Sequence, residues 1–241
     1  MAGLDEELDS VDSLLTICVN FCVNNLEATL ADKDAVGFWH LKPDVTLPVN
    51  VCENLLKAFV VNDFEINDGV LNIFSDTERT RLCRARVKDS LITDEGVAAL
   101  TRHNLVELDL SNCPFITSDV VSTIDENCRS LRALYVNDWS DFIRHFHRDH
   151  HVFRNVDLRI LIARNLSARH CPIALVERYA QCLIQSFSDL HVLDVSSASV
   201  NVADWPYLQT LKCLTSLILY DCTIVDMEEA VNSLIEIKSL R

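Results

Sequence analysis

Residues 105–113 read Leu105-Val106-Glu107-Leu108-Asp109-Leu110-Ser111-Asn112-Cys113. Leucine stands at the first, fourth and sixth positions of this segment, and a cysteine follows at the ninth. Alternation of apolar and polar residues over so short a stretch predicts a β-strand with one buried face. Similar segments occur throughout the second part of the chain, and they begin at Leu82, Leu131, Leu158, Leu190 and Leu214.

The copies follow one another at nearly constant spacing. The intervals between their first leucines are 23, 26, 27, 32 and 24 residues. The pattern L-x-x-L-x-L-x-x-N/C-x-L with a length of about 20–29 residues is that of a leucine-rich repeat. We therefore expect residues 79–241 to form an α/β leucine-rich-repeat solenoid, or horseshoe, of about six repeats. The longest interval is expected to contain a longer helix, over residues 172–187.

The segments between the predicted strands are expected to be helical. Residues 92–100 and 116–121 each begin with Thr, Ser or Asp residues that can cap a helix, and apolar residues follow at helical spacing. Leu240 lies 26 residues after Leu214, where a seventh repeat would begin. We expect this chain to be part of a longer protein, truncated at the start of that repeat.

Residues 1–78 lack the repeat and predict a separate helical region. One apolar face of a helix at residues 13–23 contains Leu14, Cys18 and Cys22, and a neighbouring face contains Leu15, Val19 and Val23. A helix that is apolar over so much of its circumference does not belong on a solvated surface. We expect the second face to pack on its own domain and the first to bind another protein.

A second helix is expected to begin at Leu47-Pro48, because proline is favoured at the first helical position. Val51, Leu55 and Phe59 follow at steps of four and form one apolar stripe. The polar residues 31–34 are interpreted as a break between the two helices. A third, weaker helical segment is predicted at residues 70–74.

Composition excludes several classes of function. The net charge of −15 disfavours binding to a phosphate backbone or to an anionic membrane surface. The acidic N-terminus does not resemble a signal or transit peptide, and no apolar run reaches the ~18 residues that a membrane span requires. We expect a cytoplasmic or nuclear protein that binds neither nucleic acid nor membrane.

The residues that could perform chemistry do not form a recognised catalytic or cofactor motif. The ten cysteines include no C-x-x-C pair. Cys18 and Cys22 are at helical spacing, and most of the others are expected to be small buried hydrophobes. Glycine-rich phosphate loops and a G-x-S-x-G elbow are absent from the sequence, so we expect no enzyme, no cofactor and no catalytic residue. The four histidines at positions 145, 147, 150 and 151 could bind zinc, but they lack a recognised ligand spacing and are interpreted as a solvated surface stretch. Candidate partner contacts on the open face of the repeats are Asp109, Tyr135, Trp139, Asp194 and Trp205.

Two segments resemble known adaptor-binding motifs. Ser13-Leu14-x-x-x-Cys18-x-x-x-Cys22 resembles the elongin-C-binding box, although the last position is Cys22 instead of an aliphatic residue or alanine. About 25 residues further on, Leu47-Pro48-x-x-Val51-x-x-x-Leu55 resembles the cullin-2 box. Recognition of this kind places an amphipathic helix in a hydrophobic groove, and here Leu14 is the expected anchor.

With residues 41–60, 73–76 and 79–113, these boxes are similar to the zyg-11 and zer-1 family of leucine-rich-repeat substrate receptors for cullin-2 ubiquitin ligases. The resemblance implies that Ser13, Leu14, Cys18 and Cys22 bind elongin C, which is paired with elongin B, and that Leu47, Pro48, Val51 and Leu55 bind cullin-2. In that family an armadillo-like domain follows the repeats and reads N-terminal degrons. Nothing in this sequence matches that domain, so the substrate-binding residues are expected to lie outside this chain.

Two other functions remain open at this point. Leu47-Pro48 and the apolar helix after it also resemble the start of an F-box, which recruits Skp and cullin-1 and is often followed by leucine-rich repeats. The additional helix at residues 13–22 favours elongin, because an F-box does not need it. Alternatively, the chain is a free-standing leucine-rich-repeat module for protein interaction, and its helical region serves only as a cap.

Overall fold

The computed structural model describes residues 13–117, 119–137, 157–164, 187, 189–197, 199–200, 208–224 and 227–241. The predicted histidine cluster at 145–151, Trp139, Trp205 and all of the predicted helix at 172–187 except Phe187 lie outside the described residues. No helix in the described part of the chain is long and apolar enough to cross a membrane.

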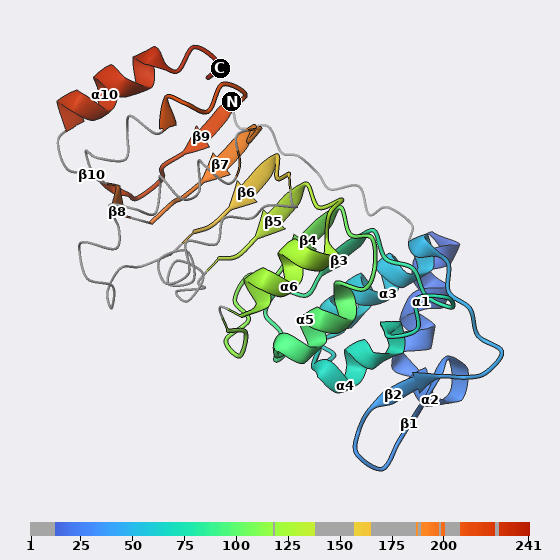
Figure 1. Cartoon of the computed structure of the whole chain (residues 1–241). Coiled ribbons are helices and arrows are strands. Elements are labelled where there is room, and N and C mark those ends of the chain that lie inside the picture. Colours follow the sequence, from blue (N-terminus) through green and yellow to red (C-terminus); the bar gives the residue numbers. More distant parts are fainter. Residues whose placement is uncertain are drawn as a thin grey trace, which may run out of the picture.

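The repeats form one parallel sheet. Among the described residues it has six strands, which lie side by side in the order of the chain (Figure 1). Arg84 pairs with Glu107, and the later pairs continue in the same register, so the predicted spacings of 23, 26, 27, 32 and 24 residues are confirmed. The strands are β3 (Arg84–Arg86), β4 (Glu107–Asp109), β5 (Ala133–Tyr135), β6 (Ile160–Ile162), β7 (Val192–Asp194) and β9 (Ser216–Ile218).

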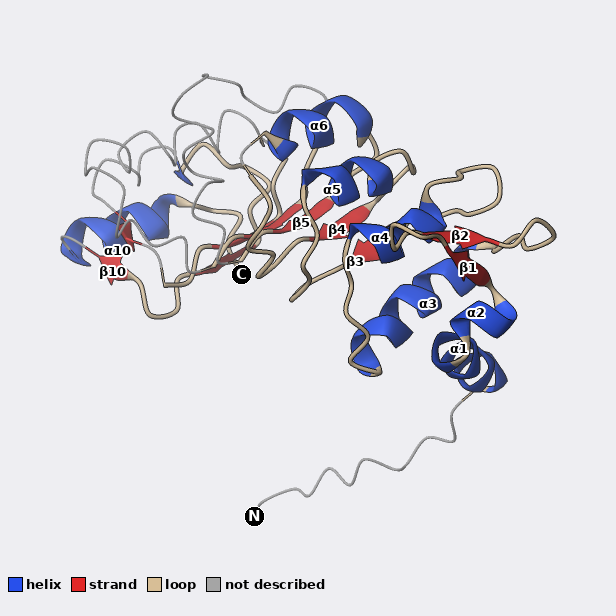
Figure 2. Ribbon diagram, turned by 90° about the horizontal axis from the view of Figure 1, so that it is seen from below, coloured by secondary structure: helices blue, strands red, loops and turns tan. Residues whose placement is uncertain are grey.

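Helices cover one face of the sheet. Figure 2 shows α5 (Asp94–Leu100) and α6 (Val120–Asn127) lying over β3 to β5, and α4 (Asp68–Leu71) precedes them in the same row. The helices predicted in residues 92–100 and 116–121 are therefore confirmed. Near the end of the sheet, α10 spans Met227–Glu236, and the short strands β8 (Ser199–Val200) and β10 (Thr223–Ile224) pair in parallel.

The repeating leucines form the core between the sheet and these helices. The first leucines of all six copies are at most 2% exposed, and Leu108 in the middle of β4 is fully buried. A left-handed turn residue follows β3, β4, β7 and β9 at the same repeat position: φ is between 55° and 60° at Asp89, Asn112, Ser197 and Asp221. Asn and Asp tolerate this conformation better than other residues that carry a side chain. The turn residues thus belong to the repeat as much as the leucines do.

The N-terminal region contains helices α1 (Leu14–Asn24), α2 (Leu26–Thr29) and α3 (Val49–Val61), followed by α4 and a 3₁₀ turn at Asn72–Phe74. The predicted helices at residues 13–22 and after Leu47-Pro48 are confirmed, and so is the short helical segment at 70–74.

The prediction of a mere polar break at residues 31–34 is wrong. An antiparallel hairpin of β1 (Ala31–Lys33) and β2 (Trp39–Leu41) occupies this place. Asp34 holds its turn, because Oδ1 accepts hydrogen bonds from the backbone N–H groups of Val36, Gly37 and Phe38 at 2.8–3.0 Å. Gly37 has a φ of 107°, which an ordinary side chain would strain.

The helical region and the repeats share one hydrophobic core. Helix α3 packs against β3, and Leu47 forms an isolated bridge with Thr80 just before the first repeat. Buried apolar residues from Val19 to Ile237 belong to a single cluster in the described part of the chain. Helices α1 and α3 therefore lie at the first edge of the sheet (Figures 1 and 2) and are continuous with its core.

A candidate protein-docking site on the first helices

Helix α1 begins at the serine of the predicted box. Ser13 adopts an extended backbone conformation, and its Oγ accepts a hydrogen bond from the Thr16 N–H at 3.2 Å. A serine in this position satisfies one of the N–H groups that a helix start leaves unpaired. The structure thus gives Ser13 the role of an N-cap.

The two predicted faces of α1 are confirmed. Val19 and Val23 are buried, and Leu15 packs against the core. On the opposite side Leu14 is 76% exposed, and Cys18 is exposed. The exposed apolar surface is broader than predicted, because it also includes Ile17 and Phe21, which are 52% and 61% exposed. We call Leu14, Ile17, Cys18 and Phe21 the outer stripe of α1; Cys22 lies half-buried at its margin.

Helix α3 supports α1 from the inside. The two helices pack together, and the Asn62 side-chain amide donates to Asn20 Oδ1 at 3.1 Å. A groove of about 280 Å³ runs between them. Its lining includes Thr16 and Asn20 from α1 and Asn54, Lys57 and Val61 from α3. Because α1 is held by the core on one side only, its outer stripe faces away from the other residues that the structure describes.

The predicted cullin-2 box, residues 47–55, is more buried than the predicted elongin-C-binding box. Pro48 is the N-cap of α3 and not its first helical residue. Leu47 and Leu55 are 6% and 0% exposed, so they stabilise the core and cannot directly contact a partner. Pro48 is exposed and Val51 is half-buried, which leaves these two of the four predicted cullin-2 residues accessible. The spacing of Val51, Leu55 and Phe59 predicted one apolar stripe, but it did not show that Leu55 and Phe59 are buried while Val51 stays partly accessible.

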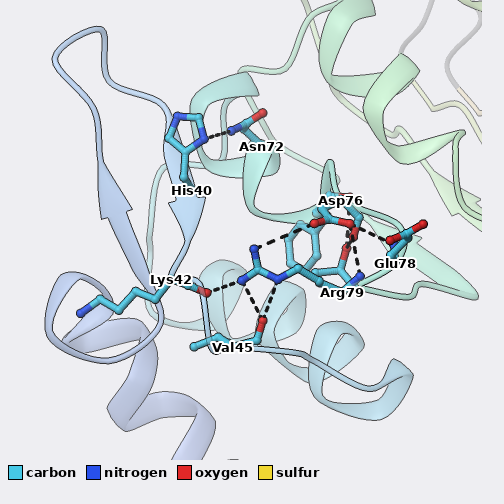
Figure 3. A network of polar contacts seen from close by, with 9 residues as sticks. His40, Lys42, Val45, Asn72, Asp76, Glu78 and Arg79 are labelled. Carbon is cyan, nitrogen blue, oxygen red and sulfur yellow. Dashed lines mark hydrogen bonds and ion pairs between the residues drawn. The ribbon is translucent and has the colours of Figure 1, made fainter.

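Arg79 holds the segment that leads into α3 (Figure 3). The Arg79 guanidinium donates from Nε and Nη2 to the Val45 carbonyl at 3.1 and 2.9 Å, and Nη2 also donates to the Lys42 carbonyl. The backbone carbonyl of Arg79 accepts from the Leu47 N–H at 2.8 Å. Residues 42–47, which lead into α3, are therefore held by the segment just before the first repeat.

A second polar contact joins the hairpin to the same region. His40 Nε2 lies 2.9 Å from Asp34 Oδ2, and His40 Nδ1 lies 3.2 Å from the Asn72 amide nitrogen (Figure 3). The hydrogen bond from His40, together with those from the backbone of the turn, lowers the pKa of Asp34 to about 2. The hairpin is thus hydrogen-bonded to the 3₁₀ turn that follows α4.

The open face of the sheet carries the other predicted contacts. Asp109 and Tyr135 line a cleft between the sheet and α3. Asp194 does not face solvent as expected, because its carboxylate accepts from Arg164 and Ser196 at 2.6 Å and is fully buried. Burial alone would raise the pKa of Asp194, but these hydrogen bonds outweigh it and lower the pKa. No cluster of metal-ligating side chains occurs among the described residues.

These observations define a protein of the leucine-rich-repeat type, with a helical region fused to its first repeat. No family model matches the chain. Over 134 residues, 52% of this chain, the sequence is 33% identical to protein zer-1 homolog of Homo sapiens. Over 132 residues, 55% of the chain, it is 29% identical to protein zer-1 homolog of Drosophila melanogaster. The matches cover only 17% and 16% of those relatives, so the similarity predicted above is confirmed for a limited part of them.

The fold has a solved counterpart as well. A chain in the crystal structure of the yeast Rad7 and Elc1 complex superposes with a TM-score of 0.53, covering 96% of this chain and 59% of that one. Sequence identity over this superposition is 18%, so the likeness concerns the fold. It extends over both the helical region and the repeats.

Proposed function

We propose that this chain is the adaptor-docking part of a substrate receptor for an elongin B/C–cullin-2 ubiquitin ligase. Helix α1 binds elongin C, and the start of α3 contributes to the choice of cullin-2. The repeats curve into a horseshoe that serves as a rigid, non-catalytic spacer in the cytoplasm or nucleus. Such a receptor raises the effective concentration of a bound substrate near the ubiquitin-loaded partner.

The observation that carries this proposal is the outer stripe of α1. A helix with an apolar stripe at positions i, i+3, i+4 and i+7 fits the groove of a partner protein. The stripe is backed by a packed face, so the helix keeps its shape when the partner is absent. Burial of Leu14 alone contributes about 1.5–3 kcal/mol to binding.

The comparisons support the proposal in two ways. The sequence similarity to zer-1 homologues covers about half of the chain. The chain also shares its fold with a component of the Rad7 and Elc1 complex, which is itself an assembly of two different proteins. The resemblance of residues 13–22 to the elongin-C-binding box supports elongin C as the protein that binds the outer stripe.

Fewer residues can contact cullin-2 directly than the cullin-2 box motif contains. Pro48 and Val51 are available for contact, whereas Leu47 and Leu55 act indirectly because they anchor α3 in the core. Arg79 has a similar indirect role, since it holds the segment that leads to Pro48.

Replacing Leu14 with lysine tests the docking surface. We expect Leu14→Lys to abolish co-purification of elongin B/C, because an ammonium group would enter an apolar pocket. Far-ultraviolet circular dichroism and the melting temperature should not change, because Leu14 is largely exposed. Retained elongin binding by the variant would contradict the assignment.

A matched control keeps the test specific. Val36 is 81% exposed in the hairpin turn, away from α1, so Val36→Lys introduces the same charge at an equally exposed aliphatic residue. This variant should bind elongin B/C like the unmodified chain.

A parallel pull-down with Skp tests the F-box alternative, which predicts Skp binding without elongin binding.

A further inference from the structure

A cleft of about 600 Å³ lies between α3 and the open face of the first three strands. Its volume is within the ~300–1,000 Å³ range of ligand-binding pockets. One wall is formed by α3 and includes Lys57, Val60 and Val61. The floor consists of the side chains that alternate away from the core, among them Arg86 on β3 and Tyr135 on β5.

The carboxylates of this cleft already have partners. Glu107 accepts a hydrogen bond from Arg86 Nε at 2.7 Å and lies 3.6 Å from Arg84 Nε. Glu53 accepts from the Arg84 backbone N–H at 3.0 Å, and Asp109 accepts from the Ser111 N–H at 3.0 Å. Each of these carboxylates therefore already accepts a hydrogen bond within the chain.

Two of its basic side chains have no such partner. Lys57 on α3 and Lys88 at the end of β3 are exposed, and neither forms an ion pair or hydrogen bond with a described residue. The same cleft has an apolar wall, in which Val61 is 66% exposed. The cleft thus presents two ammonium groups that pair with no described residue, beside an open aliphatic surface, in a chain whose net charge is −15.

We propose that this cleft binds a segment of another protein in which acidic and aliphatic side chains alternate. Carboxylates of the segment pair with Lys57 and Lys88, and an aliphatic side chain covers Val60 and Val61. Nucleic acid fits poorly, because a continuous row of phosphates would also face Glu53, Glu107 and Asp109.

The shape of the surface favours an extended segment over a small molecule. Asn54, Lys57 and Val61 line both this cleft and the groove between α1 and α3. The two depressions therefore adjoin along α3. A surface that continues from the sheet along this helix fits several consecutive residues of an extended chain, whose side chains alternate between its two sides.

Fluorescence anisotropy with a labelled peptide tests the proposal. The probe is fluorescein-labelled Asp-Leu-Glu-Leu-Asp-Leu, and the matched probe Asn-Leu-Gln-Leu-Asn-Leu lacks these side-chain charges. We expect saturable binding of the acidic probe only. The double variant Lys57→Glu/Lys88→Glu should weaken it at least tenfold, and raising salt from about 50 to about 300 mM should weaken it in the same direction.

Two control variants locate the effect. Lys238→Glu makes a similar change of charge at an exposed lysine near the end of α10, and it should leave binding unchanged. Leu14→Lys should also bind the probe normally, so the cleft is tested independently of the docking of elongin. Equal binding of both probes, no saturation at about 1 mM chain, or equal weakening by Lys238→Glu would overturn the proposal.

Discussion

At the scale of single residues, Arg79 shows how one side chain determines the start of a distant helix. Its guanidinium reaches the carbonyls of Lys42 and Val45, and its own carbonyl holds Leu47. A planar guanidinium with several fixed donors suits two neighbouring carbonyls better than an ammonium group does. The segment before α3 has little regular structure of its own, so its conformation depends on this residue.

Removal of the Arg79 side chain should destabilise the fold measurably. We expect Arg79→Ala to lower the free energy of unfolding by about 2 kcal/mol, because partly buried carbonyls lose charged donors. Arg79→Lys should give an intermediate loss. Urea denaturation followed by circular dichroism measures both. Arg102→Ala, at an exposed arginine that forms no hydrogen bond or ion pair with a described residue, is the matched control and should stay within about 0.5 kcal/mol of the parent.

Sequence patterns could not predict this contact. The acceptors of Arg79 are backbone carbonyls 34 and 37 residues away, and backbone groups carry no residue-specific signal. The hairpin was more accessible to prediction, because Asp34 and Gly37 are typical turn residues. The burial of Asp194 depends on Arg164 in the preceding repeat, a pairing that the repeat pattern does not specify.

At the scale of elements, the helices of successive repeats are joined through their caps. Thr93 caps α5, and its hydroxyl donates to Asp68 Oδ2 at 2.7 Å at the start of α4. One repeat later, Thr117 donates to Asp94 Oδ2 at 2.6 Å. Each aspartate also accepts from the backbone N–H of its threonine. The same Asp–Thr contact thus links α4 to α5 and α5 to the start of the next helical segment.

Loss of one such link should cost about 1–2 kcal/mol. Thr93→Val removes the cap of α5 and the hydroxyl that pairs with Asp68, and it keeps the shape of the side chain. Chemical denaturation of Thr93→Val, Asp68→Asn and the double variant measures the coupling between them. Thr46→Val changes an exposed threonine that takes no part in these Asp–Thr contacts, and it should leave the free energy of unfolding almost unchanged. Additive losses in the double variant would show that the two residues act independently.

The elements themselves were largely predictable from the sequence. The spacing of Leu82, Leu105 and the later leucines gave the correct register of all six strands, because each strand pairs only with its neighbours in the chain. The orientation of α1 followed from its 3.6-residue period. The sequence did not predict which residues of α3 are accessible. The burial of Leu47 and Leu55 depends on how α3 packs against β3 and the residues before it.

At the scale of the whole molecule, the contiguous core implies that the helical region and the repeats unfold together. Buried thiols report on both parts: Cys52 lies in α3, and Cys113 and Cys128 lie in the repeats. Burial raises the pKa of Cys52 and Cys113, and it raises that of Cys128 to about 12. Thiols react as thiolates, so these three should be inert in the folded chain.

Pulsed alkylation with iodoacetamide at pH 8, read by peptide mass spectrometry, tests this cooperativity. Cys18 and Cys83 are exposed and should react without denaturant. Cys52, Cys113 and Cys128 should become reactive together, at one urea concentration. Earlier reaction of Cys52 than of Cys128 would show that α3 and the repeats are separate folding units. Bound elongin B/C should protect Cys18 and leave Cys83 reactive.

The contact between α3 and the first strand also bears on self-association. β3 is an edge strand, and unpaired N–H groups on such an edge can recruit strands from other molecules. Here the Arg84 N–H is bound by Glu53 of α3, and Leu47 occupies the position beside Thr80. The helix that leads the chain into its repeats therefore also shields this edge against sheet-to-sheet aggregation.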